Sequence, residues 1–216
     1  MITEKSEAVL AYLKLHYADA KCALVFHNPF ECLVAISLSA QTTDKSVNQV
    51  TPKLFEDFPT PEKMAKAPIE AIEKDIQSLG LYHNKARNLS QLSQDLQGKF
   101  HGEVPLDFDL LTTLSGVGTK TAGVFLLEMA SRPAIPVDTH VHRIAERLGY
   151  AKKDDEPLKV EAKLEKSFLK EEWMFLHHAL INFGRQECHA QNPMCEQCGL
   201  KEYCSYFKKC SSIKGK

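Results

Sequence analysis

Apolar residues recur at helical spacing along almost the whole chain, and this periodicity restricts the fold more than any other feature. Within residues 6–17, Val9, Leu13 and Tyr17 share one helical face. Residues 119–130 are apolar nearly all round, which is typical of a central helix. No set of alternating strands appears, so the sequence predicts an all-α fold of roughly ten helices. The other expected helices cover residues 30–40, 42–58, 60–67, 68–80, 81–100, 106–114, 139–150, 157–169 and 171–188.

Composition favours an ordinary soluble protein with one large or two small domains. Hydrophobic residues make up 44% of the 216 residues and charged residues 25%. No apolar run approaches the roughly 18 residues of a membrane helix, and the charged N-terminal segment lacks a signal peptide, so we expect a cytoplasmic protein. The net charge of -1 counts mildly against a nucleic-acid binder. Pro133 and Pro136 interrupt the helical pattern and mark a boundary between two lobes.

The segment LSGVGTKTAG, residues 114–123, predicts two helices joined by a tight turn. A nucleotide-binding loop would need a strand before it, and residues 107–114 do not resemble one. Gly116 and Gly118 permit positive φ and let backbone N–H groups approach an anion at a helix N-terminus. Such a hairpin can grip a DNA phosphate without reading a base. The alternative is a corner between helices whose glycines serve geometry alone.

Lys120 is expected in the first turn of the helix that follows this hairpin. Because that helix is largely apolar, we expect desolvation and the helix dipole to lower the pKa of Lys120. A lowered pKa makes a neutral amine available as a nucleophile. The alternative is an ordinary solvated lysine.

The segment PVDTH, residues 136–140, places Asp138 directly before another helical pattern. Asp138 is therefore expected to be an N-cap, a role worth about 1 kcal/mol. A capping carboxylate is held in a fixed rotamer, which a catalytic carboxylate also needs. The separation of 18 positions between Lys120 and Asp138 does not show whether the two side chains meet.

Five of the seven cysteines crowd the C-terminal end of the chain in a C-x6-C-x2-C-x5-C pattern with one cysteine beyond it. The odd total argues against a secreted disulfide framework and for a metal or cluster site. Four thiolates suit either zinc or a [4Fe–4S] cluster, and the spacing alone does not choose between them. The fifth, Cys210, is a spare that spacing does not exclude as a ligand. The four in the pattern are Cys188, Cys195, Cys198 and Cys204.

Five motifs in this order resemble the endonuclease III family, the helix–hairpin–helix DNA glycosylases that carry an iron–sulfur cluster. They are LSAQTTD (38–44), GLYHNKA (80–86), LSGVGTKTAG (114–123), VDTHVHR (137–143) and the cysteine pattern. The resemblance covers nearly the whole chain. It implies a six-helix barrel lobe with the hairpin at 22–132, a helical cluster lobe from 1–21 and 133–216, and a DNA cleft between them.

The resemblance also implies a bifunctional DNA glycosylase and AP lyase of base excision repair. Such enzymes remove oxidised pyrimidines and cut the strand at the abasic site by Schiff-base β-elimination. Lys120 matches the nucleophile and Asp138 the essential carboxylate. Cys188, Cys195, Cys198 and Cys204 match the [4Fe–4S] ligands, which leaves Cys210 outside the set.

Six residues match DNA-contacting positions of the family. Gln41 matches the residue that fills the space of the flipped nucleotide, and Leu81 one that wedges into the opposite strand. Their alternatives are a surface glutamine and a core leucine. The implied partner is double-stranded DNA with damaged bases or abasic sites, bound by a nucleoid-associated monomer without membrane contact. The hairpin contributes the other four, Gly116, Val117, Gly118 and Thr119.

Three residues depart from the usual family pattern, and three other functions stay open. Ser115 replaces a proline, Gly123 an asparagine, and Thr119 stands where a basic residue is frequent. These changes bear on DNA affinity and substrate preference more than on the reaction type. The alternatives are a mismatch or adenine glycosylase, which typically lacks the hairpin lysine, a pyrimidine-dimer glycosylase, and a non-catalytic DNA-binding module with a zinc knot.

Overall fold

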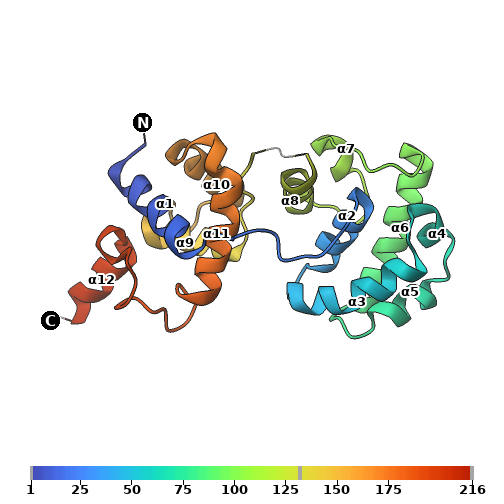
Figure 1. The fold of residues 1–216 in the computed structure, drawn as a ribbon, viewed down its shortest axis with the longest axis horizontal. Coiled ribbons are helices and arrows are strands. Elements are labelled where there is room, and N and C mark those ends of the chain that lie inside the picture. The colour runs from blue at the N-terminus through green and yellow to red at the C-terminus, as the bar shows by residue number, and fades with distance from the viewer. Residues whose placement is uncertain (1, 131–132, 215–216) are drawn as a thin grey trace. The chain divides into compact units, whose positions relative to one another are not determined.

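The computed structural model describes residues 2–130 and 133–214, so positions 1, 132 and 216 of the predicted lobe boundaries lie outside it. The described residues form twelve α-helices and two 3₁₀-helices without a strand, which confirms the all-α prediction (Figure 1). The chain divides into two compact units, Cys22–Arg132 and Met1–Lys21 with Pro133–Lys216. Each unit has a hydrophobic core of its own. None of the described helices combines the length and apolarity needed to cross a membrane.

The unit Cys22–Arg132 packs its helices around the buried α2. Seven of the ten residues of this helix are buried, which explains its almost uniformly apolar sequence. The longest helix, α6, packs against α4 and α5, and α8 packs against α2 and α7 (Figure 1). The helices are α2 (Pro29–Leu38), α3 (Asp44–Asp57), α4 (Pro61–Lys66), α5 (Ile69–Ile76), α6 (Tyr82–Phe100), α7 (Phe108–Thr112) and α8 (Thr119–Met129).

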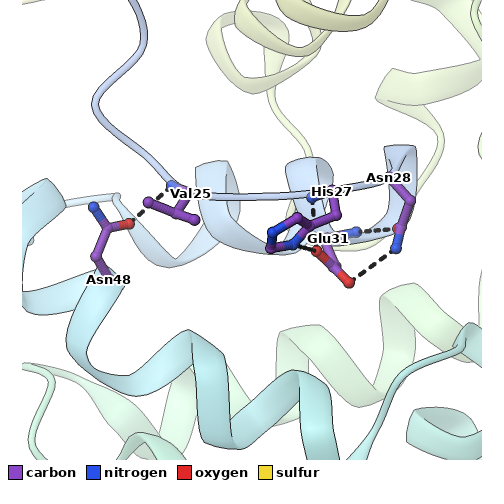
Figure 2. A network of polar contacts seen from close by, with 5 residues as sticks. All are labelled: Val25, His27, Asn28, Glu31 and Asn48. Atoms are coloured by element: carbon purple, nitrogen blue, oxygen red, sulfur yellow. Dashed lines mark hydrogen bonds and ion pairs between the residues drawn. The ribbon is translucent and has the colours of Figure 1, made fainter.

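A polar network fixes the chain where it enters this unit (Figure 2). The side-chain oxygen of Asn48 accepts a hydrogen bond from the backbone N–H of Val25 at 3.0 Å. Asn28 caps α2 by accepting from the N–H of Glu31, and the Glu31 carboxylate accepts from the N–H of His27 at 2.8 Å. The pairing resembles a capping box, but Glu31 accepts from the N–H of the residue before the N-cap, and together the two bonds fix where α2 begins.

The second unit joins both ends of the chain. The N-terminal helix α1 lies against α11, and α9 packs against α10, α11 and α12 (Figure 1). Its helices are α1 (Glu4–His16), α9 (Thr139–Leu148), α10 (Pro157–Ser167), α11 (Trp173–Gln186) and α12 (Ser205–Lys214), with the 3₁₀-helices η1 (Lys170–Glu172) and η2 (Lys201–Tyr203).

One helix end differs from the sequence prediction. We expected the helix within residues 68–80 to stop at Gly80, but α5 ends at Ile76. The chain leaves the helix early because Leu79 turns inward: it is buried, and its N–H donates to the carbonyl of Ile76 at 2.9 Å. The left-handed backbone conformation then falls on Leu81, with φ of 59°, instead of on the glycine.

Candidate functional site

The predicted hairpin is present between α7 and α8. Gly116 has φ of +77°, and a Cβ added to it would lie 3.2 Å from the Cβ of Asn88. Val117 is buried, and its N–H closes the turn on the carbonyl of Leu114 at 3.1 Å. Gly118 is the N-cap of α8 and provides no side chain to occupy the first N–H groups of that helix. The exposed turn is therefore suited to bind an anion through its backbone.

A charged network braces the hairpin from α6. Both the N–H and the hydroxyl of Ser115 donate to one carboxylate oxygen of Asp95, at 2.9 and 2.8 Å. Lys99 pairs with the other oxygen at 3.2 Å and donates to the carbonyl of Thr113. Burial opposes ionisation of Asp95, but the hydrogen bonds from Ser115 and the charge of Lys99 outweigh it and lower its pKa. A proline at position 115 has no N–H to make this contact.

Lys120 occupies the first turn of α8, as predicted, but its environment differs from the prediction. The helix begins at Thr119, and the Lys120 side chain is exposed. The desolvation that we expected from an apolar helix is therefore wrong for this residue. The apolar side chains of α8 lie further along the helix, where Ala122, Phe125 and Leu126 are buried. The position of Lys120 at a helix N-terminus agrees with the prediction.

Gln41 and Leu81 share an unusual geometry. Both are exposed, and both have left-handed backbone conformations, with φ of 55° and 59°. Leu81 is 59% exposed, so the alternative of a core leucine is wrong. A bulky residue in this conformation costs on the order of 1 kcal/mol or more, and such strain is concentrated at functional sites.

Asp138 is the N-cap of α9, which confirms the capping role. Its carboxylate accepts from the N–H of Val141 at 2.8 Å and is partly buried. The same helix carries His140, whose ring nitrogen lies 3.2 Å from the guanidinium of Arg143. Burial lowers the pKa of His140 and favours the neutral ring.

The four cysteines of the C-terminal pattern line one pocket. It holds about 400 Å³ of space not filled by atoms, including its open mouth, and its lining combines apolar side chains with Arg147, Glu187 and Lys201. Burial raises the pKa of the Cys198 thiol to about 11, so a thiolate here needs a compensating positive charge. In the part of the chain that the structure describes, no three Cys, His, Asp or Glu side chains converge on one metal-ion position. The four residues are Cys188, Cys195, Cys198 and Cys204.

Two donors already point at sulfur atoms of this pocket. The guanidinium of Arg147 lies 3.2 Å from the Sγ of Cys188, and the N–H of Phe207 lies 3.5 Å from the Sγ of Cys204. Arg147 is only 9% exposed and also donates to the carbonyl of His189 at 2.6 Å. The sequence reasoning missed Arg147, whose only signal was a basic residue on the inner face of an amphipathic helix.

The N-terminal helix and its C-cap residue Tyr17 hold the segment that directly precedes Cys188. Tyr12 and Tyr17 donate to the two carboxylate oxygens of Glu187, at 2.7 and 2.5 Å. The Tyr12 ring also covers Gly199, where an added Cβ would lie 2.5 Å from a ring carbon. Glu187 directly precedes Cys188, so α1 fixes the position of a pocket cysteine. Because these residues are far apart in the sequence, no local pattern indicated the contact.

Comparison with known proteins decides the family. Residues 34–170 match the model of the HhH-GPD superfamily base excision DNA repair proteins. Endonuclease III of Bacillus subtilis (strain 168) is 47% identical over 188 residues, which cover 87% of this chain and 86% of that protein. The chain belongs to the endonuclease III family. Endonuclease III of Escherichia coli (strain K12) is 38% identical over 201 residues, 93% of this chain and 95% of that one.

Solved structures of the family superimpose on the whole fold. A trapped endonuclease III–DNA covalent intermediate matches with a TM-score of 0.91 and 47% identity, over 98% of this chain and all of that one. A non-covalent endonuclease III–DNA complex matches with a TM-score of 0.92 over the same shares. The protein is therefore a DNA glycosylase and AP lyase of base excision repair.

Proposed function

We propose that this endonuclease III family member removes oxidised pyrimidines from double-stranded DNA and then cuts the strand with Lys120 as the nucleophile. The observation that carries the proposal is the exposed Lys120 in the first turn of the helix that a Gly-Val-Gly hairpin opens. The amine and the anion-binding turn share one helix N-terminus, so the element that grips the backbone also presents the nucleophile.

The chemistry proceeds in two stages on an everted nucleotide. The neutral Nζ of Lys120 forms a bond to C1′ while the glycosidic bond breaks and the departing base takes the electron pair and a proton. Loss of the amine proton and opening of the sugar ring leave an imine between Lys120 and C1′. The imine acidifies C2′; removal of a C2′ proton forms a carbon–carbon double bond and expels the 3′ phosphate.

Asp138 is the proposed acid–base partner in this sequence. Its carboxylate is held in one rotamer by the N–H of Val141, so it is oriented before the substrate binds. A carboxylate can accept the lysine proton and stabilise positive charge that develops on the sugar. The capping bond and the catalytic role are compatible, because a carboxylate has two oxygens.

DNA recognition is assigned to exposed backbone and side chains of the unit Cys22–Arg132. The hairpin residues Gly116, Gly118 and Thr119 offer backbone to a phosphate, whereas the buried Val117 side chain anchors the turn. Gln41 and Leu81 would fill and wedge the space that a flipped nucleotide leaves. We assign the unit Cys22–Arg132 to the helix–hairpin–helix domain, the other unit to the cluster domain, and the protein to a monomer that works on chromosomal DNA.

The cysteine pocket is proposed to hold a [4Fe–4S] cluster. A tetrahedral zinc ion draws its four sulfur atoms to about 3.8 Å from one another, given Zn–S bonds of roughly 2.3 Å. A [4Fe–4S] cluster would take one thiolate at each iron atom, and the described thiols line one pocket without converging on a single metal-ion position, which favours a cluster over zinc. A bound cluster would supply a structural centre, and Arg147 and Phe207 would donate hydrogen bonds to the thiolates of Cys188 and Cys204 that hold it.

The decisive experiment is borohydride trapping on DNA with thymine glycol or an abasic site. The unaltered protein should form a covalent adduct. Lys120→Gln should abolish the adduct but keep the broad absorbance at about 400 nm that an iron–sulfur cluster gives. Lys45→Gln is the matched control because Lys45 is also the second residue of an exposed helix start, that of α3. Full trapping by Lys120→Gln refutes the nucleophile assignment.

Substrate preference is tested with a panel of duplexes that each hold a single lesion. Oxidised pyrimidines should be excised fastest, and preference for a mismatch or a pyrimidine dimer would replace the proposed substrate class. Asp138→Asn should slow base removal by orders of magnitude, and an unchanged rate would leave Asp138 only its capping role. Iron and sulfide analysis of the purified protein separates the cluster from zinc.

A further inference from the structure

Lys85 is a buried lysine whose ammonium group contacts a turn far away in the sequence. It is 8% exposed, although lysine is among the residues least often buried. Its Nζ donates to the carbonyl of Leu38 at 2.7 Å and to the hydroxyl of Thr42. Within the described residues, Lys85 has no ion pair with a carboxylate.

The two acceptors of Lys85 bracket the turn that carries Gln41. Leu38 is the last residue of α2, and Thr42 lies just before α3, where its N–H bonds the carbonyl of Ser39 at 3.1 Å. Lys85, which lies on α6, therefore bridges the two ends of the connection between α2 and α3. The turn presents Gln41 in its left-handed conformation at the surface.

The same lysine belongs to the helix start that carries Leu81. The N–H of Lys85 donates to the carbonyl of Leu81 at 3.0 Å and forms the first hydrogen bond of α6. Leu81 is the residue before the helix, also left-handed and exposed. One residue thus holds the Gln41 turn with its side chain and the Leu81 backbone with its amide.

We propose that Lys85 is a positioning residue that holds the Gln41 turn and the Leu81 helix start as one rigid element for DNA opening. The inference rests on the proposed function, because it needs Gln41 and Leu81 to enter the duplex. Two side chains that must enter one base stack lose less entropy if the protein orders them beforehand. A buried amine without a counter-ion costs stability, and this structural advantage offsets that cost.

Burial lowers the pKa of Lys85, which is consistent with an amine held for geometry instead of for surface charge. The role predicts a selective defect. A protein without this brace should open a paired duplex slowly, yet should process a lesion that is already unpaired at nearly the normal rate.

The test is Lys85→Met, which keeps the length and apolar stem of the side chain but removes the amine. Single-turnover excision of thymine glycol is measured in a fully paired duplex and in a bubble of three unpaired nucleotides. We expect about tenfold slower excision from the duplex and less than twofold slower excision from the bubble. Fluorescence of 2-aminopurine opposite the lesion should rise more slowly on mixing. Lys66→Met is the control, because Lys66 is exposed and, among the described residues, its one ion pair is with Glu62.

A second pair of variants covers the case in which Lys85→Met does not fold. Thr42→Val removes the acceptor hydroxyl and should give the same duplex-selective defect, whereas Thr42→Ser should restore the duplex rate. Equal slowing on both substrates, or no slowing on either, overturns the inference. Failure of the proposed function gives a different result. If Gln41 and Leu81 do not enter the duplex, Gln41→Ala and Leu81→Ala will also excise the lesion at the same relative rate from the duplex and from the bubble.

Discussion

The hairpin and the cysteine pocket are both built from short motifs, but they are supported in opposite ways. The hairpin is braced by side chains 14 to 20 residues away, through Lys99 and Asp95 on α6. The pocket segment is clamped by Tyr12 and Tyr17, which are 175 and 170 residues from Glu187. The difference teaches that the hairpin is held by nearby residues, whereas the cysteine pocket depends on contacts between the two ends of the chain.

Removal of a pocket cysteine should produce the largest difference between the two regions. Cys198→Ala deletes a proposed ligand, and metal binding contributes folding free energy directly, on the order of several kcal/mol. We expect loss of the absorbance near ~400 nm and faster hydrogen exchange in peptides from residues 133–214. Peptides from residues 22–130 should keep their protection, because this unit has its own core.

Cys210→Ser is the matched control, since Cys210 lies outside the four-cysteine pattern and should leave the absorbance intact. Loss of the cluster in Cys210→Ser would make Cys210 a ligand. Equal loss of protection in both units after Cys198→Ala would show that the regions do not fold independently.

The long-range clamp is tested by Tyr17→Phe. The change leaves one oxygen of the Glu187 carboxylate without its donor at a partly buried site, which costs about 2 kcal/mol. Urea unfolding monitored by exchange should show the loss only in the unit that contains α1 and α11. Tyr203→Phe, which removes a longer 3.4 Å contact to Glu4, should change stability by less than about 0.5 kcal/mol. If the two variants lose the same amount of stability, the Tyr17–Glu187 hydrogen bond does not contribute specifically to the stability of this unit.

The local geometry of the hairpin is tested by Gly116→Ala. Alanine at position 116 would have to adopt the left-handed backbone conformation, and its Cβ would press against Asn88. We expect a loss of stability of about 1–2 kcal/mol. Gly118→Ala is the control for backbone strain, since nothing lies within 4 Å of an added Cβ and φ is -87°, so its cost is limited to the N-cap preference for glycine over alanine. Chemical unfolding of both variants gives the comparison. Similar stability of the two would show that the turn tolerates a side chain at position 116.

The sequence predicted the parts of the molecule that depend on local rules. The helical periodicity, the hairpin and the Asp138 cap all follow from residues within one turn of one another. The exposure of Lys120 was mispredicted, because an apolar helix does not specify which of its turns is buried. Lys85 and Arg147 were missed, since their partners lie 40 or more residues away and no spacing rule connects them.

The smallest effect should be that of Ser115→Ala, which removes one hydrogen bond to Asp95 and keeps the backbone N–H. The loss should be about 1 kcal/mol at pH 7, because the acceptor is a charged carboxylate. The pKa of Asp95 is lowered in the folded protein, so its stabilisation is present above the unfolded pKa of about 3.9 and disappears as pH falls through the folded value. The difference in unfolding free energy between the variant and the unaltered protein should therefore shrink below about pH 4. A difference that stays constant between pH 7 and pH 3 would mean that the Ser115 hydroxyl does not stabilise the ionised carboxylate, and the hairpin would then be held by the Ser115 N–H and by Lys99 without help from that hydroxyl.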